Sequence, residues 1–277
     1  ICYKSRLLYC VNRYYYANEY PNLDFYNQKF SFNENFKEND FFEVMNLDSV
    51  SSFNINRNNF APCSFQYLVN DNICYTNFEN IVEFHKNIHF SPIIPCYGCI
   101  RFIDNKNRIL VYKYMKNKNI KHKFNKQKDY FTPEIVSATI YRISSVILFL
   151  HSNNLIHRKI TISNSYFDSY NRVYLGGFNL IINEDGNNEY SREEFSKEDH
   201  QNTKEYDIQS FGELIIKLYE NAPNCLDQKI KELAKNCMDK KVNALDVLKE
   251  ILKNNFFYLG KKRDVLNFLI SDQFDLS

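Results

Sequence analysis

The order of apolar and polar residues divides this chain into a strand-rich stretch followed by a helical one. Apolar residues recur at helical spacing between residues 78 and 88, and two β-like runs follow over residues 93–102 and 108–115. The turn-prone residues 104–107 join these runs. Residues 1–60 are rich in aromatic residues and asparagine, with weak periodicity. The first half is therefore predicted to contain a helix and a pair of strands.

The second half of the chain has the stronger helical pattern. Thr132, Pro133 and Glu134 combine a capping hydroxyl, a proline suited to the first turn and an acid favoured by the helix dipole. The helix that begins there is expected to run to about His151. Further helices are expected near residues 208–219, 227–237 and 244–252, and short strands near residues 165–167 and 172–175.

Together these elements predict an α+β fold with two lobes. The chain has 277 residues, which is enough to bury a substantial core. We assign residues 1–45 to an N-terminal extension, 46–115 to a strand-rich small lobe and 116–277 to a helical large lobe. The chain starts with Ile1, so we expect it to be a piece of a longer product. Because no apolar run approaches the roughly 20 residues that cross a bilayer, we expect no membrane span in this chain.

The charge of the chain is nearly balanced. There are 35 basic and 33 acidic residues, and the net charge is +2. This balance gives no drive toward nucleic acid or an anionic membrane, so neither is expected as a partner. A local cluster of lysines alternates with asparagine and lacks the interleaved aromatic residues on which bases would stack. We therefore interpret it as a solvated loop. The cluster comprises Lys116, Lys118, Lys121, Lys123, Lys126 and Lys128.

Eight cysteines are too few for a disulfide scaffold in a chain of this length. This favours a reducing compartment and an intracellular location. Only Cys96 and Cys99 have the spacing of metal ligands. A structural zinc site needs about four ligands, and no second pair of this kind exists. We interpret the two cysteines as small apolar residues of a buried strand and expect no metal site.

Several segments of the chain, including residues 89–98 and those named below, resemble parts of a protein kinase. Residues 155–164, which contain Ile156-His157-Arg158-Lys159, resemble the catalytic loop, and Gly177-Phe178-Asn179 resembles the magnesium motif that follows it. Residues 63–68 resemble the third strand of the small lobe, and residues 110–115 resemble the fifth strand and hinge. Asp207-Ile208-Gln209-Ser210-Phe211-Gly212 resembles the start of the central buried helix. The resemblance implies the bilobal protein-kinase fold.

The resemblance also places unusual residues where kinase chemistry is performed. Lys159 stands at the position of the catalytic base, and a cation cannot accept the hydroxyl proton. Gly177 stands at the position of the magnesium-binding aspartate, while Asn164, a potential magnesium ligand, persists. One neutral amide is a poor site for a hard cation. Gln66 replaces the phosphate-binding lysine without its charge, and Tyr112 falls at the gatekeeper position.

Other matched positions imply structural roles. The resemblance implies that Asp207 reaches the backbone of the catalytic loop at His157 and Arg158 and holds it. His157, Phe178 and Phe84 would form a hydrophobic stack. Asn179 replaces the glycine of the magnesium motif, so only Phe178 remains of that motif.

Three functions follow as hypotheses. The first is a catalytically inactive kinase-like domain, a pseudokinase, that binds a protein partner of unknown identity as a scaffold or allosteric module. It needs no cofactor, and the losses above make ATP binding doubtful. The second is an atypical active serine/threonine kinase in which Asp168, Glu184 or Asp185 supplies the missing carboxylate, although we interpret all three as exposed loop charges. The third is a region of a larger protein whose N-terminal aromatics, including residues 14–16, bind a partner.

Overall fold

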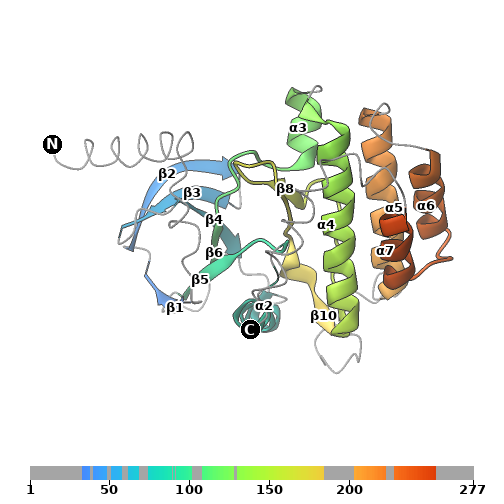
Figure 1. Ribbon diagram of the computed structural model, residues 1–277. Coiled ribbons are helices and arrows are strands. Elements are labelled where there is room, and N and C mark those ends of the chain that lie inside the picture. The colour runs from blue at the N-terminus through green and yellow to red at the C-terminus, as the bar shows by residue number, and fades with distance from the viewer. Residues whose placement is uncertain are drawn as a thin grey trace. The chain divides into compact units, whose positions relative to one another are not determined.

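The computed structural model contains two compact units of the chain (Figure 1). One combines residues 1–75 with 95–114, and the other combines residues 76–94 with 115–277. Strands dominate the first unit and helices the second, so the expected α+β class is confirmed. The structure describes residues 33–37, 40–48, 51–57, 62–68, 74–88, 90, 92–101, 108–127, 130–183, 203–222 and 228–253.

A six-stranded mixed sheet forms the first unit. Its strands follow the order β1-β5-β6-β4-β3-β2, in which β1 and β5 are parallel and all other neighbours are antiparallel. The two β-like runs predicted in this region are confirmed as the antiparallel pair β5 and β6. The strands are β1 (Asn33–Phe36), β2 (Phe41–Asp48), β3 (Ser51–Asn56), β4 (Pro62–Leu68), β5 (Cys96–Arg101) and β6 (Arg108–Lys113).

The sheet begins earlier in the chain than the sequence pattern suggested. Strand β1 and most of β2 belong to the stretch that we assigned to an N-terminal extension ending at residue 45. Strand β1 pairs with β5 at Gly98, whose φ is +151°. A Cβ atom at this position would collide with the carbonyl oxygen of Asn33, so the close approach of the two strands requires glycine.

One face of the sheet carries the core of this unit. Cys63 and Phe65 of β4 are buried together with Ile109 and Val111 of β6. Cys99 of β5 is also buried, and burial raises the pKa of the neighbouring Cys96 thiol. Within the described residues no three potential metal ligands cluster. Both Cys96 and Cys99 lie in β5, as the sequence interpretation held, but only Cys99 is buried and Cys96 is half-buried.

Six helices are described in the chain, and five of them lie wholly in the second unit. Helix α4 packs against α5 and α7, and α6 packs against both α5 and α7 (Figure 1). The three helices expected after residue 203 are confirmed with bounds shifted by a few residues. The helices are α2 (Cys74–Asn87), α3 (Ile120–Lys126), α4 (Pro133–Ser152), α5 (Lys204–Asn221), α6 (Gln228–Met238) and α7 (Ala244–Lys253).

Helix α4 begins as its sequence predicts. The side chain of Thr132 accepts a hydrogen bond from the backbone N–H of Ile135, and Pro133 occupies the first helical position. By length and composition alone α4 could cross a membrane, but 61% of its apolar window is buried inside the protein, as in a core helix. That the chain has no membrane span remains a prediction.

The lysine cluster is not the solvated loop that we expected, because part of it forms helix α3. Asn119 caps the helix by accepting a hydrogen bond from the backbone N–H of His122. Lys123 is buried, its Nζ donates to Gln127 at 2.8 Å, and it lies 4.0 Å from the centre of the Tyr130 ring. Tertiary packing therefore overrides the polar local pattern here.

Short strands frame the segment that resembles a catalytic loop. Strand β7 (Leu155–Ile156) pairs with β10 (Ile182–Asn183), and β8 (Ser165–Phe167) pairs with β9 (Val173–Leu175). A single 3₁₀ turn, η4 (Phe178–Leu180), follows β9. The segment of interest, residues 157–164, connects β7 to β8.

Candidate functional site

Asp207 in the first turn of α5 holds the segment that follows β7. Its carboxylate is fully buried and accepts hydrogen bonds from the backbone N–H groups of His157 and Arg158, each at 2.8 Å. Its Oδ2 also lies 3.1 Å from Nε2 of His151. Arg158 has a φ of +69°, which is uncommon for a residue with a side chain. The two backbone bonds, which the resemblance implied for Asp207, therefore fix a turn that is unfavourable on its own.

His157 is a structural residue in this arrangement. Its side chain is buried, its Nε2 donates to the carbonyl oxygen of Gly176 at 3.1 Å, and its Nδ1 accepts from the backbone N–H of Lys159 at 3.1 Å. With Nδ1 as an acceptor, the ring is neutral and carries its hydrogen on Nε2. Burial lowers the pKa of His157 to about 4, although the nearby Asp207 and the Gly176 carbonyl act in the opposite direction.

We expect His157 to make the domain less stable below pH 6.5. The unfolded chain binds a proton at His157 near its ordinary pKa of 6.5, whereas the folded ring does so only near 4. Between these values the unfolded state holds more protons, so the free energy of unfolding rises with pH. The contribution of His157 is complete above pH 6.5 and falls toward pH 4, by on the order of 2–3 kcal/mol. Urea unfolding at near-neutral and mildly acidic pH would measure this.

The variant His157→Gln provides the control for this pH dependence. Glutamine can still donate and accept hydrogen bonds but does not titrate. Its free energy of unfolding should change less between the two pH values than that of the wild type. Equal pH dependence in both proteins would show that His157 is not responsible.

Phe178 stacks between two other rings in the helical unit. Its ring lies 4.8 Å from that of Phe84 on α2 at an interplanar angle of 25°, and 4.7 Å from the imidazole of His157 in an edge-on arrangement. All three side chains are buried. Such ring pairs stabilise packing beyond the area that they bury. Phe178, the one residue of the magnesium motif that this chain retains, is therefore a packing residue.

Gly177 and Asn164 lie against each other. Gly177 has a φ of +83°, and a Cβ atom built on it would lie 2.6 Å from both Cγ and Nδ2 of Asn164. The carboxamide of Asn164 donates from Nδ2 to the carbonyl oxygen of Lys159 at 2.9 Å, which holds it there. The side chain of Lys159 is exposed. Asn179 lies in η4, but its side chain is outside the described part of the structure.

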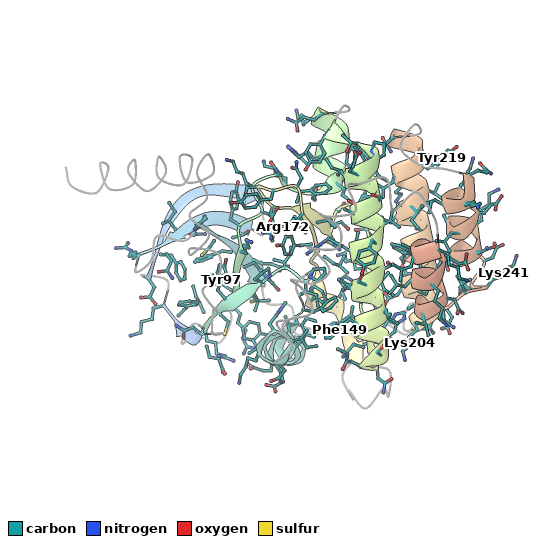
Figure 2. The ribbon with its side chains drawn as sticks, in the orientation of Figure 1. Tyr97, Phe149, Arg172, Lys204, Tyr219 and Lys241 are labelled. Atoms are coloured by element: carbon teal, nitrogen blue, oxygen red, sulfur yellow. The ribbon has the colours of Figure 1, made fainter. Side chains whose placement is uncertain are left out.

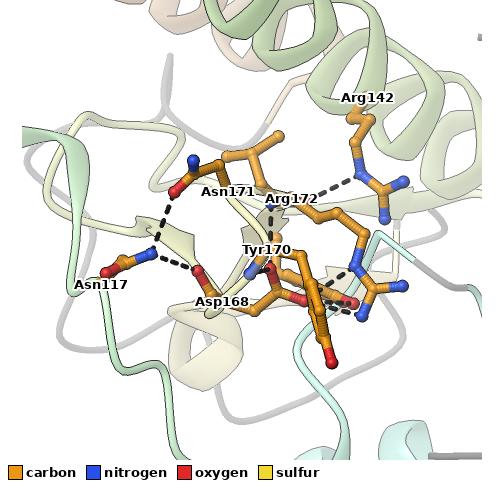
Figure 3. A network of polar contacts seen from close by, with 8 residues as sticks. Asn117, Arg142, Asp168, Tyr170, Asn171 and Arg172 are labelled. Atoms are coloured by element: carbon orange, nitrogen blue, oxygen red, sulfur yellow. Dashed lines mark hydrogen bonds and ion pairs between the residues drawn. The ribbon is translucent and has the colours of Figure 1, made fainter. Parts of the chain in front are cut away.

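Asp168 is the centre of a buried polar network at the turn between β8 and β9 (Figure 3). Its carboxylate accepts hydrogen bonds from the backbone N–H groups of Tyr170 and Arg172 at 2.8 and 3.0 Å. It also accepts from Nε of Arg172 at 2.8 Å and pairs with Nη2 of Arg172 at 2.7 Å. The hydroxyl of Tyr174 donates to it at 3.4 Å, and Asn117 donates to its backbone carbonyl at 2.7 Å.

This network corrects the sequence interpretation of Asp168. The residue is only 2% exposed, so it is not an exposed loop charge. Both of its carboxylate oxygens already accept hydrogen bonds, which leaves it poorly suited to replace a missing catalytic acid. The other two acids considered for that role, Glu184 and Asp185, lie outside the described residues.

Gln66 and Tyr112 lie on neighbouring strands of the sheet in the first unit. In the register of β4 and β6, Ser64 is opposite Tyr112 and Gln66 is opposite Leu110. Because residues opposite each other share a face and alternate residues repeat it, Gln66 and Tyr112 are diagonal neighbours on the same face. Both are half-buried. This face is opposite the one that carries Cys63 and Phe65.

Sequence reasoning missed several residues that hold the 157–164 segment. One of them is His151, which contacts Asp207 as described above. It lies at the end of an apolar helix, and nothing in the neighbouring sequence indicates that contact. The side chain of Asn119 donates to the carbonyl oxygen of Ser163 at 2.9 Å, and the backbone N–H of Lys121 donates to that of Ile162 at 3.2 Å. The start of α3 therefore supports the segment. The alternation of lysine and asparagine did not indicate this role, because it is typical of a solvated loop.

A groove of about 410 Å³ opens in the helical unit near the start of α5. Lys204 and Lys241, labelled in Figure 2, contribute charge to its lining, and Val242 contributes an apolar side chain. His151 also lines the groove, so the groove borders the residue that contacts Asp207. The Nζ of Lys204 already donates to the side chain of Asn154 at 3.3 Å.

Comparison with known proteins finds similarity to protein kinases. Residues 70–203 match the family described as protein tyrosine and serine/threonine kinase. A probable serine/threonine-protein kinase PLK of Dictyostelium discoideum is 20% identical over 157 residues, which cover 53% of this chain and 16% of that protein. An Aurora kinase of Yarrowia lipolytica is 24% identical over 110 residues, 40% of this chain and 29% of that protein.

A human relative gives a similar match. Mitogen-activated protein kinase kinase kinase 3 of Homo sapiens is 29% identical over 97 residues, which cover 35% of this chain and 15% of that protein. The chain thus spans less than a third of the length of each of these three relatives. The similarity concerns a domain and not the whole of those proteins.

Proposed function

Because this chain belongs to the protein kinase superfamily, we propose that its domain does not transfer phosphate and acts as a protein-interaction module, either a scaffold or an allosteric partner. Phosphoryl transfer depends on positioning the reactants and on stabilising charge. At the two positions where the family pattern expects carboxylates, this chain has Lys159 and Gly177. The domain would lack both the group that orients the substrate hydroxyl and the group that holds magnesium.

The contact between Asn164 and Gly177 is the observation that carries this proposal. The carboxamide of Asn164 fills the space that a side chain at residue 177 would need, and its amide is bonded to the Lys159 carbonyl. The backbone of Gly177 adopts a φ of +83°, a conformation that costs glycine less than a residue with a Cβ atom. The local packing is therefore adapted to glycine and would resist the return of the carboxylate.

Several residues that match the family pattern make contacts that hold the fold together. Asp207 binds two backbone N–H groups, His157 bridges two backbone groups, and Phe178 completes a ring stack. None of these contacts needs nucleotide or metal. A domain that keeps its framework while it lacks the reacting groups suits a role in binding another protein, whose identity remains open.

The alternative is an atypical active serine/threonine kinase. The relatives, which include an Aurora kinase and a mitogen-activated protein kinase kinase kinase, favour this class. The alternative needs a replacement carboxylate, and the buried network at Asp168 argues against that residue. Glu184 and Asp185 are the acids on which this alternative now depends.

We expect the purified domain to release no phosphate from ATP above the rate of a denatured sample. We also expect ATP with magnesium or manganese to raise the melting temperature no more than ATP alone, because a ligand raises stability only by binding the native state. Phosphate release and thermal-shift titrations, with and without metal, measure the two expectations. A metal-dependent shift accompanied by phosphate release would contradict the proposal.

Three variants make this test specific. If turnover is observed, its loss in Asn164→Ala or in the double variant Glu184→Ala/Asp185→Ala would assign it to this domain and establish the alternative. Turnover that all of these changes leave unaltered would come from a contaminating enzyme. Gly177→Asp alone should lower the melting temperature and should not gain a metal-dependent shift, because the new side chain must displace Asn164.

A further inference from the structure

Helix α3 and the residues before it carry a group of positive charges with no acid among them. Residues 116–127 contain five lysines and no aspartate or glutamate. Of these lysines, Lys118, Lys121 and Lys126 are exposed, and among the described contacts none of the three side chains forms an ion pair. We call these three residues the α3 lysine face. The whole chain has a net charge of only +2, so the positive charge here is a local feature.

Helical geometry places the charges on the solvent side of α3. Ile120, Lys123 and Phe124 are buried and form the inner side of the helix. At roughly 100° per residue, Lys121 and Lys126 fall about 140° apart on the opposite side, with His122 between them. The exposed side of the helix therefore carries only cationic or neutral side chains.

The stability of the helix does not explain this arrangement. The first turn of α3 contains no acid, and Lys118 and Lys121 lie near its N-terminus, where the helix dipole disfavours positive charge. The pKa of His122 is lowered, first by partial burial and then by repulsion from Lys118, Lys123 and Lys126. The positive charges thus repel one another, and an anionic partner would relieve that repulsion.

We propose that the α3 lysine face docks an acidic peptide segment of a partner protein. Helix α3 has seven residues, a length of about 10 Å, which matches three or four residues of an extended peptide. Binding of nucleic acid usually combines a longer basic track with aromatic side chains on which bases stack. The exposed side of α3 carries His122 but no Phe, Tyr or Trp side chain, so a short run of carboxylates is the better fit.

The docked segment would lie beside the residues that resemble a catalytic loop. The backbone N–H of Lys121 donates to the carbonyl of Ile162, and Asn119 donates to the carbonyl of Ser163. A peptide on the α3 lysine face would therefore contact an element that is directly bonded to the 157–164 segment. This inference goes beyond the proposed function, because such docking would serve an active or an inactive kinase domain alike.

The test measures binding of a fluorescein-labelled, glutamate-rich peptide to the full chain by fluorescence anisotropy. The triple variant Lys118→Glu/Lys121→Glu/Lys126→Glu is expected to bind at least about tenfold more weakly than the wild type. The affinity of the wild type should also fall as salt is added, because the contacts are exposed.

A matched variant controls for net charge. Lys229, Lys235 and Lys249 are exposed lysines of α6 and α7, and Lys229→Glu/Lys235→Glu/Lys249→Glu changes the charge by the same amount. This variant should bind the peptide nearly as well as the wild type, and thermal unfolding checks that both variants fold. Equal weakening in both variants, or no binding by the folded wild type at low salt, would overturn the proposal. Tighter binding of single-stranded RNA than of the peptide, with the same dependence on the α3 lysine face, would also overturn it.

Discussion

The variant Asp207→Ala is expected to lose about 3–5 kcal/mol of the free energy of unfolding. The carboxylate of Asp207 is fully buried and accepts the backbone N–H groups of His157 and Arg158, each at 2.8 Å. Alanine would leave both N–H groups without their acceptor in a site from which water is excluded. It would also remove the partner of His151. The positive φ of Arg158 would then lose the contact that offsets its strain.

Urea unfolding followed by circular dichroism measures this loss. Asp207→Asn should lie between the wild type and Asp207→Ala, because its single carbonyl oxygen can still accept from one of the backbone groups. Asp239→Ala is the matched control, since that carboxylate is exposed and pairs with Lys241 at 2.9 Å. Removing such a surface pair should cost less than about 1 kcal/mol. A wild-type-like stability of Asp207→Ala would show that Asp207 does not hold the segment.

The helices were the most predictable part of the fold. At α4 the cap at Thr132, the proline at Pro133 and an apolar pattern all point to one helix start, and the structure places it there. Agreement between local signals of this kind is what makes an element recognisable from sequence. The apolar patterns of α6 and α7 likewise gave their positions to within a few residues.

The missed elements depend on contacts between distant residues. Strand β1 is defined by its pairing with β5, which begins 60 residues after β1 ends, so its own four residues carry little signal. In α3 the buried positions Ile120, Lys123 and Phe124 are interrupted by Lys121 and His122, and one buried position is itself a lysine. The burial of Lys123 depends on Gln127 and Tyr130, which the periodicity of apolar residues does not register.

The positions of the candidate site could be named from the family resemblance, but their contacts could not. Nothing in the sequence indicates that Asn164 lies against Gly177, because that contact depends on a positive φ and on one side-chain conformation. The protonation state of His157 likewise follows from the burial of its ring and from the two backbone groups around it. Asp168 was misjudged because five of its contacts come from the chain folding back within a tight turn.

The variant Asp168→Ala is expected to lose about 2–4 kcal/mol of the free energy of unfolding. Its carboxylate binds the backbone N–H groups of Tyr170 and Arg172 and pairs with the Arg172 guanidinium at 2.7 Å. Alanine would leave those N–H groups and the arginine without their acceptor. The loss should be smaller than at Asp207, because the side chain of Arg172 is 37% exposed and can be solvated. Urea unfolding provides the measurement.

Comparison with Arg172→Ala separates the backbone contacts of Asp168 from its ion pair. That variant removes the guanidinium but keeps the acceptor for the two backbone N–H groups, so it should be less destabilising than Asp168→Ala. If Asp168 instead served chemistry, Asp168→Asn would abolish any phosphate release while leaving stability nearly intact, since asparagine keeps the size of the side chain. The network of Figure 3 predicts the reverse: a measurable loss of stability in Asp168→Asn, because an amide cannot accept hydrogen bonds through both of its terminal atoms.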